Sequence, residues 1–291
     1  MYVHGDNLKS KEAVSKNGKY VDEESLILLK EIREKYDLWK QSNIELTGPL
    51  QEETDEDANI IAKRVSLFND YKNFIDQQNY AEKFDSRSNL HSSVLEEFIY
   101  YLFRDLVYSF SPNALLGKAH AFKDIFFQAS NFANMVTKPN TKIEKKDHDF
   151  VIGINVHSKM HCAGQTEEEI DIFQIPAVAI ECKTYLDKTM LEASSTSAQQ
   201  LMYKNPNAIY IVVAEWLKLT SNVNLRKYKV DQIYVFRKQK NTDREYRYAE
   251  TYIKNPIYPD VIEHLFNYVR KHLTTDWENG TAHGISKGYL I

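Results

Sequence analysis

Two charged residues, Glu181 and Lys183, stand at the end of an otherwise mostly apolar run that begins at Gln174. The run has the composition of a β-strand, in which side chains alternate between the two faces of the sheet. The even-numbered residues from 178 to 182 are apolar and are expected to face a core, whereas Glu181 and Lys183 share the opposite face with small alanines. A carboxylate and an amine at the end of a buried strand predict a chemical site.

A second strand is expected over residues 149–156, and Asp149 opens it on the face opposite its large apolar side chains. If the two strands pair, Asp149 comes to lie beside Glu181 and Lys183. Two carboxylates supply the oxygen ligands that Mg²⁺ prefers, and an ammonium group can contact a phosphate. These residues therefore predict a site for Mg²⁺ and a phosphate group, with the carbonyl of Cys182 as a further metal ligand.

The spacing of an acid, any residue and a lysine is a weak signal by itself, because the same triplet occurs at residues 70–72 and 144–146. Those two triplets lie in a helical pattern and in a charged loop, whereas the triplet 181–183 ends a strand. Asp147 is a rival to Asp149 as the partner of this triplet. The alternation favours Asp149, because it heads the strand directly.

Asp149 followed by Glu181, Cys182 and Lys183 resembles the site of the PD-(D/E)xK nuclease superfamily. The runs 181–188 and 93–103 look like those of type II restriction endonucleases of the BbvCI-like group. The resemblance covers roughly residues 90–240. It departs from the superfamily pattern at one position, since His148 and not proline precedes the aspartate.

The resemblance implies Mg²⁺-dependent hydrolysis of phosphodiester bonds in double-stranded DNA at a specific short site. It also implies a cognate DNA methyltransferase as a functional partner in the cell. In many nucleases of this kind a glutamate from the helix before the sheet contributes to the metal site. Ser93 and Glu96 match a capping box, which gives Glu96 a structural role. Glu97, outside the apolar stripe of this helix, is therefore expected as the metal ligand, the alternative being an exposed glutamate.

The expected fold is α/β (α+β): a restriction-endonuclease-like core in which a mixed sheet is flanked by helices, with a helical N-terminal region. Helices are expected over 22–41, 54–80, 93–107, 119–136 and 191–203, and strands over 149–156, 173–184, 208–215 and 232–236. A polar, turn-rich stretch near residue 88 suggests a boundary. Residues 1–88 then form a helical region for DNA recognition or dimerisation, and residues 89–291 form the nuclease domain with a basic C-terminal segment.

The composition agrees with an intracellular enzyme. No run approaches the roughly 20 apolar residues that cross a bilayer, and the first residues lack the features of a signal peptide. With only two cysteines, a disulfide framework is not expected, and the cytoplasm is the predicted location. The net charge of −4 does not exclude DNA binding, because the distribution of charge matters more than its sum.

Basic residues cluster before the first predicted active-site strand and again in the C-terminal third of the chain. Phosphate contacts by such residues give affinity for DNA and make it sensitive to salt. The residues proposed for DNA contact are Lys145, Lys146, Lys188, Arg226, Lys227 and Lys229. The alternative is a solvated charged surface without a partner.

His157, His161 and Cys162 are metal-binding residue types close together in sequence, which raises the alternative of a zinc site. No fourth ligand is evident, so a surface loop is expected there. Asp171 shares the strand face of Glu181, but ten residues of extended chain separate them by about 33 Å. Asp171 is therefore left out of the site.

Two other functions fit the same residues. One is a repair or mobile-element nuclease that cuts without strict sequence specificity, and the other is a non-catalytic DNA-binding subunit. One site cuts one strand of DNA, so a double-strand cut implies either a homodimer or a heterodimer with a related subunit. The sequence leaves both arrangements open.

Overall fold

The computed structural model describes residues 2–13, 19–84, 89–241, 248–277, 285–286 and 288. The helices are α1 (Val3–Glu12), α3 (Glu23–Glu45), α4 (Asp57–Ile75), α5 (Gln78–Lys83), α6 (Leu90–Phe110), α7 (Phe132–Met135), α8 (Lys188–Lys204) and α9 (Pro259–Thr274). The strands are β1 (Leu115–Phe127), β2 (Thr141–Met160), β3 (Glu169–Leu186), β4 (Ile209–Leu217) and β5 (Gln232–Val235). A short 3₁₀ helix, η2, covers Leu225–Lys227.

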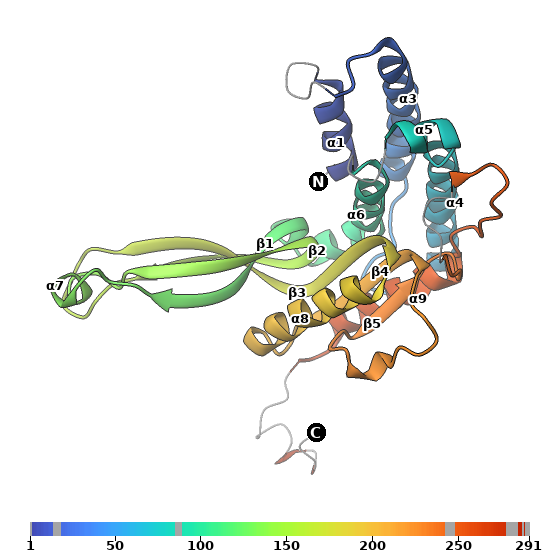
Figure 1. Ribbon diagram of the computed structural model, residues 1–291. Coiled ribbons are helices and arrows are strands. Elements are labelled where there is room, and N and C mark those ends of the chain that lie inside the picture. Colours follow the sequence, from blue (N-terminus) through green and yellow to red (C-terminus); the bar gives the residue numbers. More distant parts are fainter. Residues whose placement is uncertain are drawn as a thin grey trace.

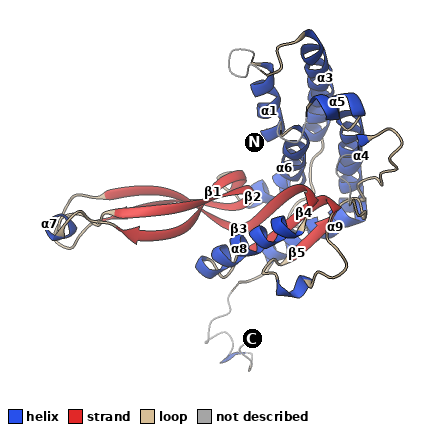
Figure 2. Ribbon diagram, viewed as in Figure 1, coloured by secondary structure: helices blue, strands red, loops and turns tan. Residues whose placement is uncertain are grey.

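The five strands form one mixed sheet in the order β1-β2-β3-β4-β5. β1 and β3 each pair with β2 in antiparallel fashion, whereas β3, β4 and β5 run parallel to one another. Helix α8 forms the crossover between the parallel strands β3 and β4, which an antiparallel hairpin cannot provide. The predicted mixed sheet flanked by helices is confirmed (Figure 2).

Each face of the central sheet packs against different helices, as the alternation along β3 predicted. Val178, Ile180 and Cys182 join a core that includes residues of α6 and α9. Ala179 belongs to the other core, which is shared with β4 and α8. Glu181 and Lys183 continue the row of Ala179, so the charged pair lies on the α8 side of the sheet.

Helix α6 is the centre of the helical part of the molecule. Helices α1 and α4 contact it directly, α3 packs against both of them, and α6 itself packs on the sheet. Nearly every side chain of α6 between Leu90 and Leu106 is buried for this reason. The N-terminal helices therefore share one continuous hydrophobic core with the sheet.

One prediction of secondary structure was wrong. A helix was expected over residues 119–136, but Leu115–Phe127 form strand β1 and only Phe132–Met135 are helical. β1 pairs with β2 from Leu115↔Gly153 to Phe127↔Thr141. The order of apolar and polar residues here is compatible with a helix or a strand, and the long-range hydrogen bonds to β2 decide for the strand.

The outer parts of β1, β2 and β3 form an arm, residues 119–148 and 154–175, that extends away from the body and carries α7 at its tip (Figure 1). Glu169 pairs with Met160 and also accepts hydrogen bonds from the backbone of Thr141, so both ends of β2 lie at the tip. The middle of β2 lies in the body, which means that β2 folds back on itself. Gly153 permits this, because a Cβ there would lie 2.1 Å from the carbonyl oxygen of Ile175.

A buried ion cluster connects α4 with β4 and with the chain that follows β5. Lys72 Nζ lies 3.1 Å from Asp76 and 2.9 Å from Glu215. Arg237 contacts Glu215 at 3.2 Å, and Lys254 contacts Asp76 at 3.2 Å. Arg237 belongs by sequence to the basic cluster in the C-terminal third of the chain, but it is fully buried and cannot contact DNA.

Within the part of the chain that the structure describes, no helix has both the length and the apolar character needed to cross a membrane. Both cysteines are free thiols, with Cys182 buried and Cys162 partly exposed. The predicted boundary near residue 88 falls on residues 85–88, which lie outside the described residues.

Candidate active site

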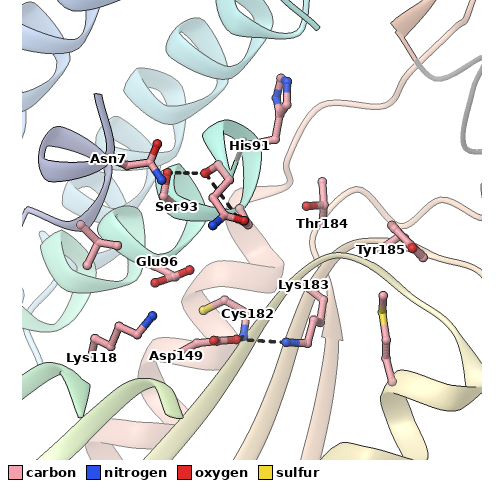
Figure 3. A pocket seen from close by; sticks show the side chains of 14 residues that line it. Asn7, His91, Ser93, Glu96, Lys118, Asp149, Cys182, Lys183, Thr184 and Tyr185 are labelled. Carbon is pink, nitrogen blue, oxygen red and sulfur yellow. Dashed lines mark hydrogen bonds and ion pairs between the residues drawn. The ribbon is translucent and has the colours of Figure 1, made fainter. Parts of the chain in front are cut away.

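The structure brings Asp149, Glu181 and Lys183 together at the point where two strands separate. The last pair between β2 and β3 joins Phe150 and Ile180, so Asp149 and Glu181 are the next residue on each strand. Lys183 Nζ donates to Asp149 Oδ2 at 3.1 Å (Figure 3). It also donates to Glu181 Oε1 at 2.6 Å. The adjacency that the spacing predicted is present, and the chemical roles stay predictions.

Two further groups hold the carboxylates in place. The backbone N–H of Cys182 donates to Asp149 Oδ2 at 3.0 Å, which fixes the aspartate across the gap between the strands. The hydroxyl of Tyr210 on β4 donates to Glu181 Oε2 at 3.1 Å. Tyr210 was not predicted from the sequence. Its position opposite Ala179 in the β3–β4 register is known only once the strands are paired.

The two neighbouring glutamates of α6 have the opposite roles from those expected. Helix α6 begins at Leu90 with Asn89 as its N-cap residue, so Ser93 lies inside the helix and donates to the Asn89 carbonyl oxygen at 2.6 Å. Glu96 is therefore not part of a capping box, and its carboxylate points into the cleft beside Lys118 and Asp149 (Figure 3). The correct helix start places Glu96, not Glu97, at the site.

Glu97 binds the N-terminal segment instead of a metal. Its carboxylate accepts hydrogen bonds from the backbone N–H groups of His4 at 2.8 Å and Gly5 at 3.1 Å. It also accepts from the hydroxyls of Tyr36 at 2.9 Å and Tyr101 at 2.8 Å. A buried carboxylate with four donors has its hydrogen-bonding capacity filled by the protein, which makes Glu97 a structural residue.

The site carries an excess of negative charge. Burial, and then the neighbouring Glu181, raise the pKa of Asp149 even though Lys183 opposes the shift. Burial, and then the charge of Asp149, raise the pKa of Glu96 to about 7. Burial alone would lower the pKa of Lys183, but Asp149 and Glu181 raise it overall, so the amine stays protonated at neutral pH. Carboxylates whose charge is disfavoured in this way are suited to binding a cation.

A cleft with a volume of about 420 Å³ opens over Glu96, Asp149 and Lys183, and Glu181 lies beside it. Asn7 of α1 and Lys118 of β1 stand on its walls with Glu96, so the N-terminal helix contributes to the cleft. The remaining lining residues are Val3, Asn89, His91, Ser92, Ser93, Asp149, Cys182, Lys183, Thr184, Tyr185 and Met190. Polar groups outnumber apolar ones along this wall, which fits a charged substrate.

The donor set fits a divalent cation. Within the described ranges no three His, Cys, Asp or Glu side chains already form a metal-binding group, and Lys183 bonds to both Asp149 and Glu181. Oε2 of Glu96, however, is buried without a hydrogen-bond partner. Such an oxygen is costly to leave unsatisfied, and a cation would satisfy it. Oxygen atoms from three carboxylates are the ligands that Mg²⁺ prefers.

The rival residues lie elsewhere. Asp147 is exposed and pairs with His120 on the neighbouring strand, so it does not reach the cleft. Cys162 donates its thiol to the carbonyl oxygen of Met135, and His161 lies against the Cys162 carbonyl oxygen at 3.1 Å. His157 lies on β2, whereas His161 and Cys162 follow the strand in a loop, as expected.

The residues proposed for DNA contact are all exposed. Lys145 and Lys146 lie on β2, and Lys145 Nζ donates to the carbonyl oxygen of Ile172 at 3.0 Å. Lys188 is the first residue of α8. Arg226 and Lys227 belong to η2, and Lys229 follows it. Arg244 and Arg247, counted in the basic segment from the sequence, lie outside the described residues.

A mixed sheet whose separating strands carry an aspartate, a glutamate and a lysine has the arrangement that the resemblance to PD-(D/E)xK nucleases predicted. The family model of the Bpu10I restriction endonuclease matches residues 87–290, more than two thirds of the 291 residues. The chain belongs to this restriction endonuclease family.

The fold is also that of a solved restriction enzyme. The chain superposes on a structure described as the native BbvCI A2B2 tetramer at low resolution, with a TM-score of 0.67 and 20% sequence identity. The similarity covers 94% of this chain and 98% of the BbvCI chain, so the helical N-terminal region belongs to the shared fold. A comparison with curated proteins finds no match.

Proposed function

We propose that the protein is a type II restriction endonuclease that uses Mg²⁺ to hydrolyse phosphodiester bonds at a specific short site in double-stranded DNA. The observation that carries the proposal is the cluster of Asp149, Glu181 and Lys183 at the edge of a polar cleft. Family membership supports DNA cleavage, and the cluster supplies the residues for it.

Each residue has a distinct task in this reaction. Asp149 and Glu181 would hold the cation, together with the carbonyl of Cys182 and the carboxylate of Glu96. A bound Mg²⁺ would polarise the scissile phosphate and lower the pKa of a coordinated water. Because its pKa is raised, Lys183 acts as a cation and hydrogen-bond donor and not as a base. Its ammonium orients the attacking water and stabilises the charge that gathers on the phosphate in the transition state.

The cleavage test compares wild-type protein with Lys183→Ala on unmodified plasmid DNA in Mg²⁺ and in EDTA. Discrete fragments from the wild type, lost in the variant and in EDTA, support the proposal. A smear or random nicking would instead support a nuclease without strict specificity. If neither Mg²⁺ nor Mn²⁺ bound in a calorimetric titration, the non-catalytic DNA-binding subunit would be the better account. Sequencing the fragment ends gives the recognition site and the cut position.

A double-strand cut requires a second active site. We therefore propose that the chain acts with a second copy or with a related subunit, as the BbvCI assembly consists of two kinds of chain. Exposed Lys145, Lys146 and Lys188 are proposed to contact DNA phosphates, as are Arg226, Lys227 and Lys229. Such an enzyme works in the cytoplasm beside a methyltransferase that protects the host's own sites.

A further inference from the structure

The tip of the arm exposes large apolar side chains. We define the tip patch as Phe127, Phe132, Met135 and Val136, whose exposed fractions are 61%, 76%, 55% and 48%. The two phenylalanines alone leave roughly 200–350 Å² of aromatic surface in contact with water, given about 150–250 Å² for a whole ring side chain. Apolar patches of this size on a protein surface often mark a binding site.

The base of the arm carries an apolar groove. We define the base groove by the space between the C-terminal ends of α6 and α9 and the folded-back part of β2, with a volume of about 590 Å³. Phe110, Ile154 and Trp277 line it and are 44%, 54% and 38% exposed. Cavities of roughly 300–1,000 Å³ accept groups as large as several aromatic rings. The groove therefore has room for the side chains of a tip patch.

The tip patch and the base groove cannot meet within one chain. The groove lies at the body, whereas α7 lies at the far end of the arm (Figure 1). Residues 119–127 of β1 alone span about 30 Å when extended. A second molecule has to supply the occupant of each surface.

The charge of the arm argues against DNA as the occupant of the tip. Residues 119–148 and 154–175 contain six lysines, no arginine and seven Asp or Glu residues. The tip lysines Lys138 and Lys159 pair with Glu167 and Glu168 of the same arm. DNA affinity comes largely from unpaired basic residues that neutralise phosphates, and the tip offers apolar rings instead.

We propose that two copies of this chain exchange arms, so that the tip patch of each copy occupies the base groove of the other. A two-fold axis makes such an exchange reciprocal, with the same two surfaces used twice. Arms lying side by side in opposite directions bring the two active-site clefts within about one arm length of each other. This proposal rests on the proposed function only because a double-strand cut needs two active sites. Arm exchange supplies the surface that joins the two copies.

The test is sedimentation velocity at micromolar protein without DNA or Mg²⁺, which makes the result independent of catalysis. Wild-type protein is expected to form a dimer. Phe132→Asp in the tip patch and Ile154→Asp in the base groove should each raise the dissociation constant of the dimer at least about tenfold. Both copies carry the substitution, so each variant places a charge in both of the apolar contacts. Ile253→Asp is the matched control, since Ile253 is 87% exposed and lies in neither surface. It is expected to dimerise like the wild type.

A mixture of the two variants gives the sharpest result. Phe132→Asp retains an intact groove and Ile154→Asp an intact tip, so the mixed pair keeps one of two contacts and dimerises better than either variant alone. A monomeric wild type, or a Phe132→Asp protein that dimerises normally, overturns the proposal. If Phe132→Asp dimerised normally but lost affinity for DNA, the tip would be a DNA contact. Lys183→Ala is expected to dimerise normally, because Lys183 lies in neither surface. A loss of cleavage can therefore be distinguished from a loss of dimerisation.

Discussion

Two clusters of acidic and basic residues in this molecule use the same residue types in opposite ways. In the buried ion cluster, three cations surround the carboxylates of Asp76 and Glu215. At the active site, Lys183 is shared by Asp149 and Glu181, and the Glu96 carboxylate stands next to them with an unpartnered oxygen. The cations of the first cluster compensate its carboxylates, whereas Lys183 and Lys118 are outnumbered by three carboxylates in the second.

The two aspartates report this difference through their pKa values. Burial alone would raise the pKa of Asp76, but Lys72 and the other cations hold it well below its usual range. Burial and Glu181 raise the pKa of Asp149. An aspartate whose ionised form is favoured stabilises the fold, whereas one whose ionised form is disfavoured is ready for an added cation. The direction of the pKa shift of the aspartate thus distinguishes the structural cluster from the catalytic one.

The largest effect is expected for Lys183→Ala. Loss of the ammonium that stabilises the transition-state charge should lower the cleavage rate by roughly 10³-fold, while the fold stays intact. The rate is measured on plasmid DNA, and circular dichroism checks the fold. Lys63→Ala is the control, because Lys63 is exposed on α4 and does not line the cleft. Wild-type cleavage by Lys183→Ala would refute the assignment.

The reverse outcome is expected for the buried ion cluster. Lys72→Met leaves two buried carboxylates short of a cation and should lower the free energy of unfolding by about 3–5 kcal/mol. The rate per folded molecule should change little, because Lys72 does not touch the cleft. Urea titration measures the stability, and Lys63→Met at an exposed position of α4 is the control. If Lys72→Met kept its stability but lost cleavage, the buried ion cluster would be catalytic and not structural.

Addition of Mg²⁺ should act on one cluster only. At about 100 times the dissociation constant, a ligand that binds only the folded state adds about 2.7 kcal/mol to its stability. The melting temperature of the wild type should therefore rise with Mg²⁺. The rise should vanish in Asp149→Asn and persist in Asp76→Asn, each compared with its own metal-free sample. Equal responses from the two variants would place the cation elsewhere.

The smallest effects are expected in the pH dependence of metal-free stability, and the two clusters should differ in sign. The folded state raises the pKa of Glu96 from 4.5 to about 7, so it holds a proton that the unfolded chain releases, and stability falls as pH rises through that range. Asp76 has a depressed pKa, so its contribution is present at neutral pH and is lost as pH falls below its unfolded value of 3.8. Melting curves of Glu96→Gln and Asp76→Asn test the two ranges separately. A Glu96→Gln curve that still falls like the wild type would contradict the assignment.

The sequence was sufficient where the structure depends on local alternation. A period of two along one strand identified Glu181 and Lys183, and the alternation after residue 149 identified Asp149. The predicted strand start was wrong, because β2 begins at Thr141 and Asp149 lies within it. The sequence failed for Glu96 and Glu97, because α6 is buried on nearly all sides and its apolar stripe says little about direction. The ion cluster was also missed, since its members come from segments far apart in the chain.

The division of work between Glu96 and Glu97 has a consequence for how relatives of this protein can change. An insertion or deletion of one residue in α6 before Glu96 would rotate both carboxylates by about 100° around the helix. The negative charge of Glu96 in the cleft and the hydrogen bonds of Glu97 to the N-terminal segment would then be lost together. Among homologous sequences, we therefore expect substitutions in residues 90–97 but no change in their number, while the arm tolerates differences in length.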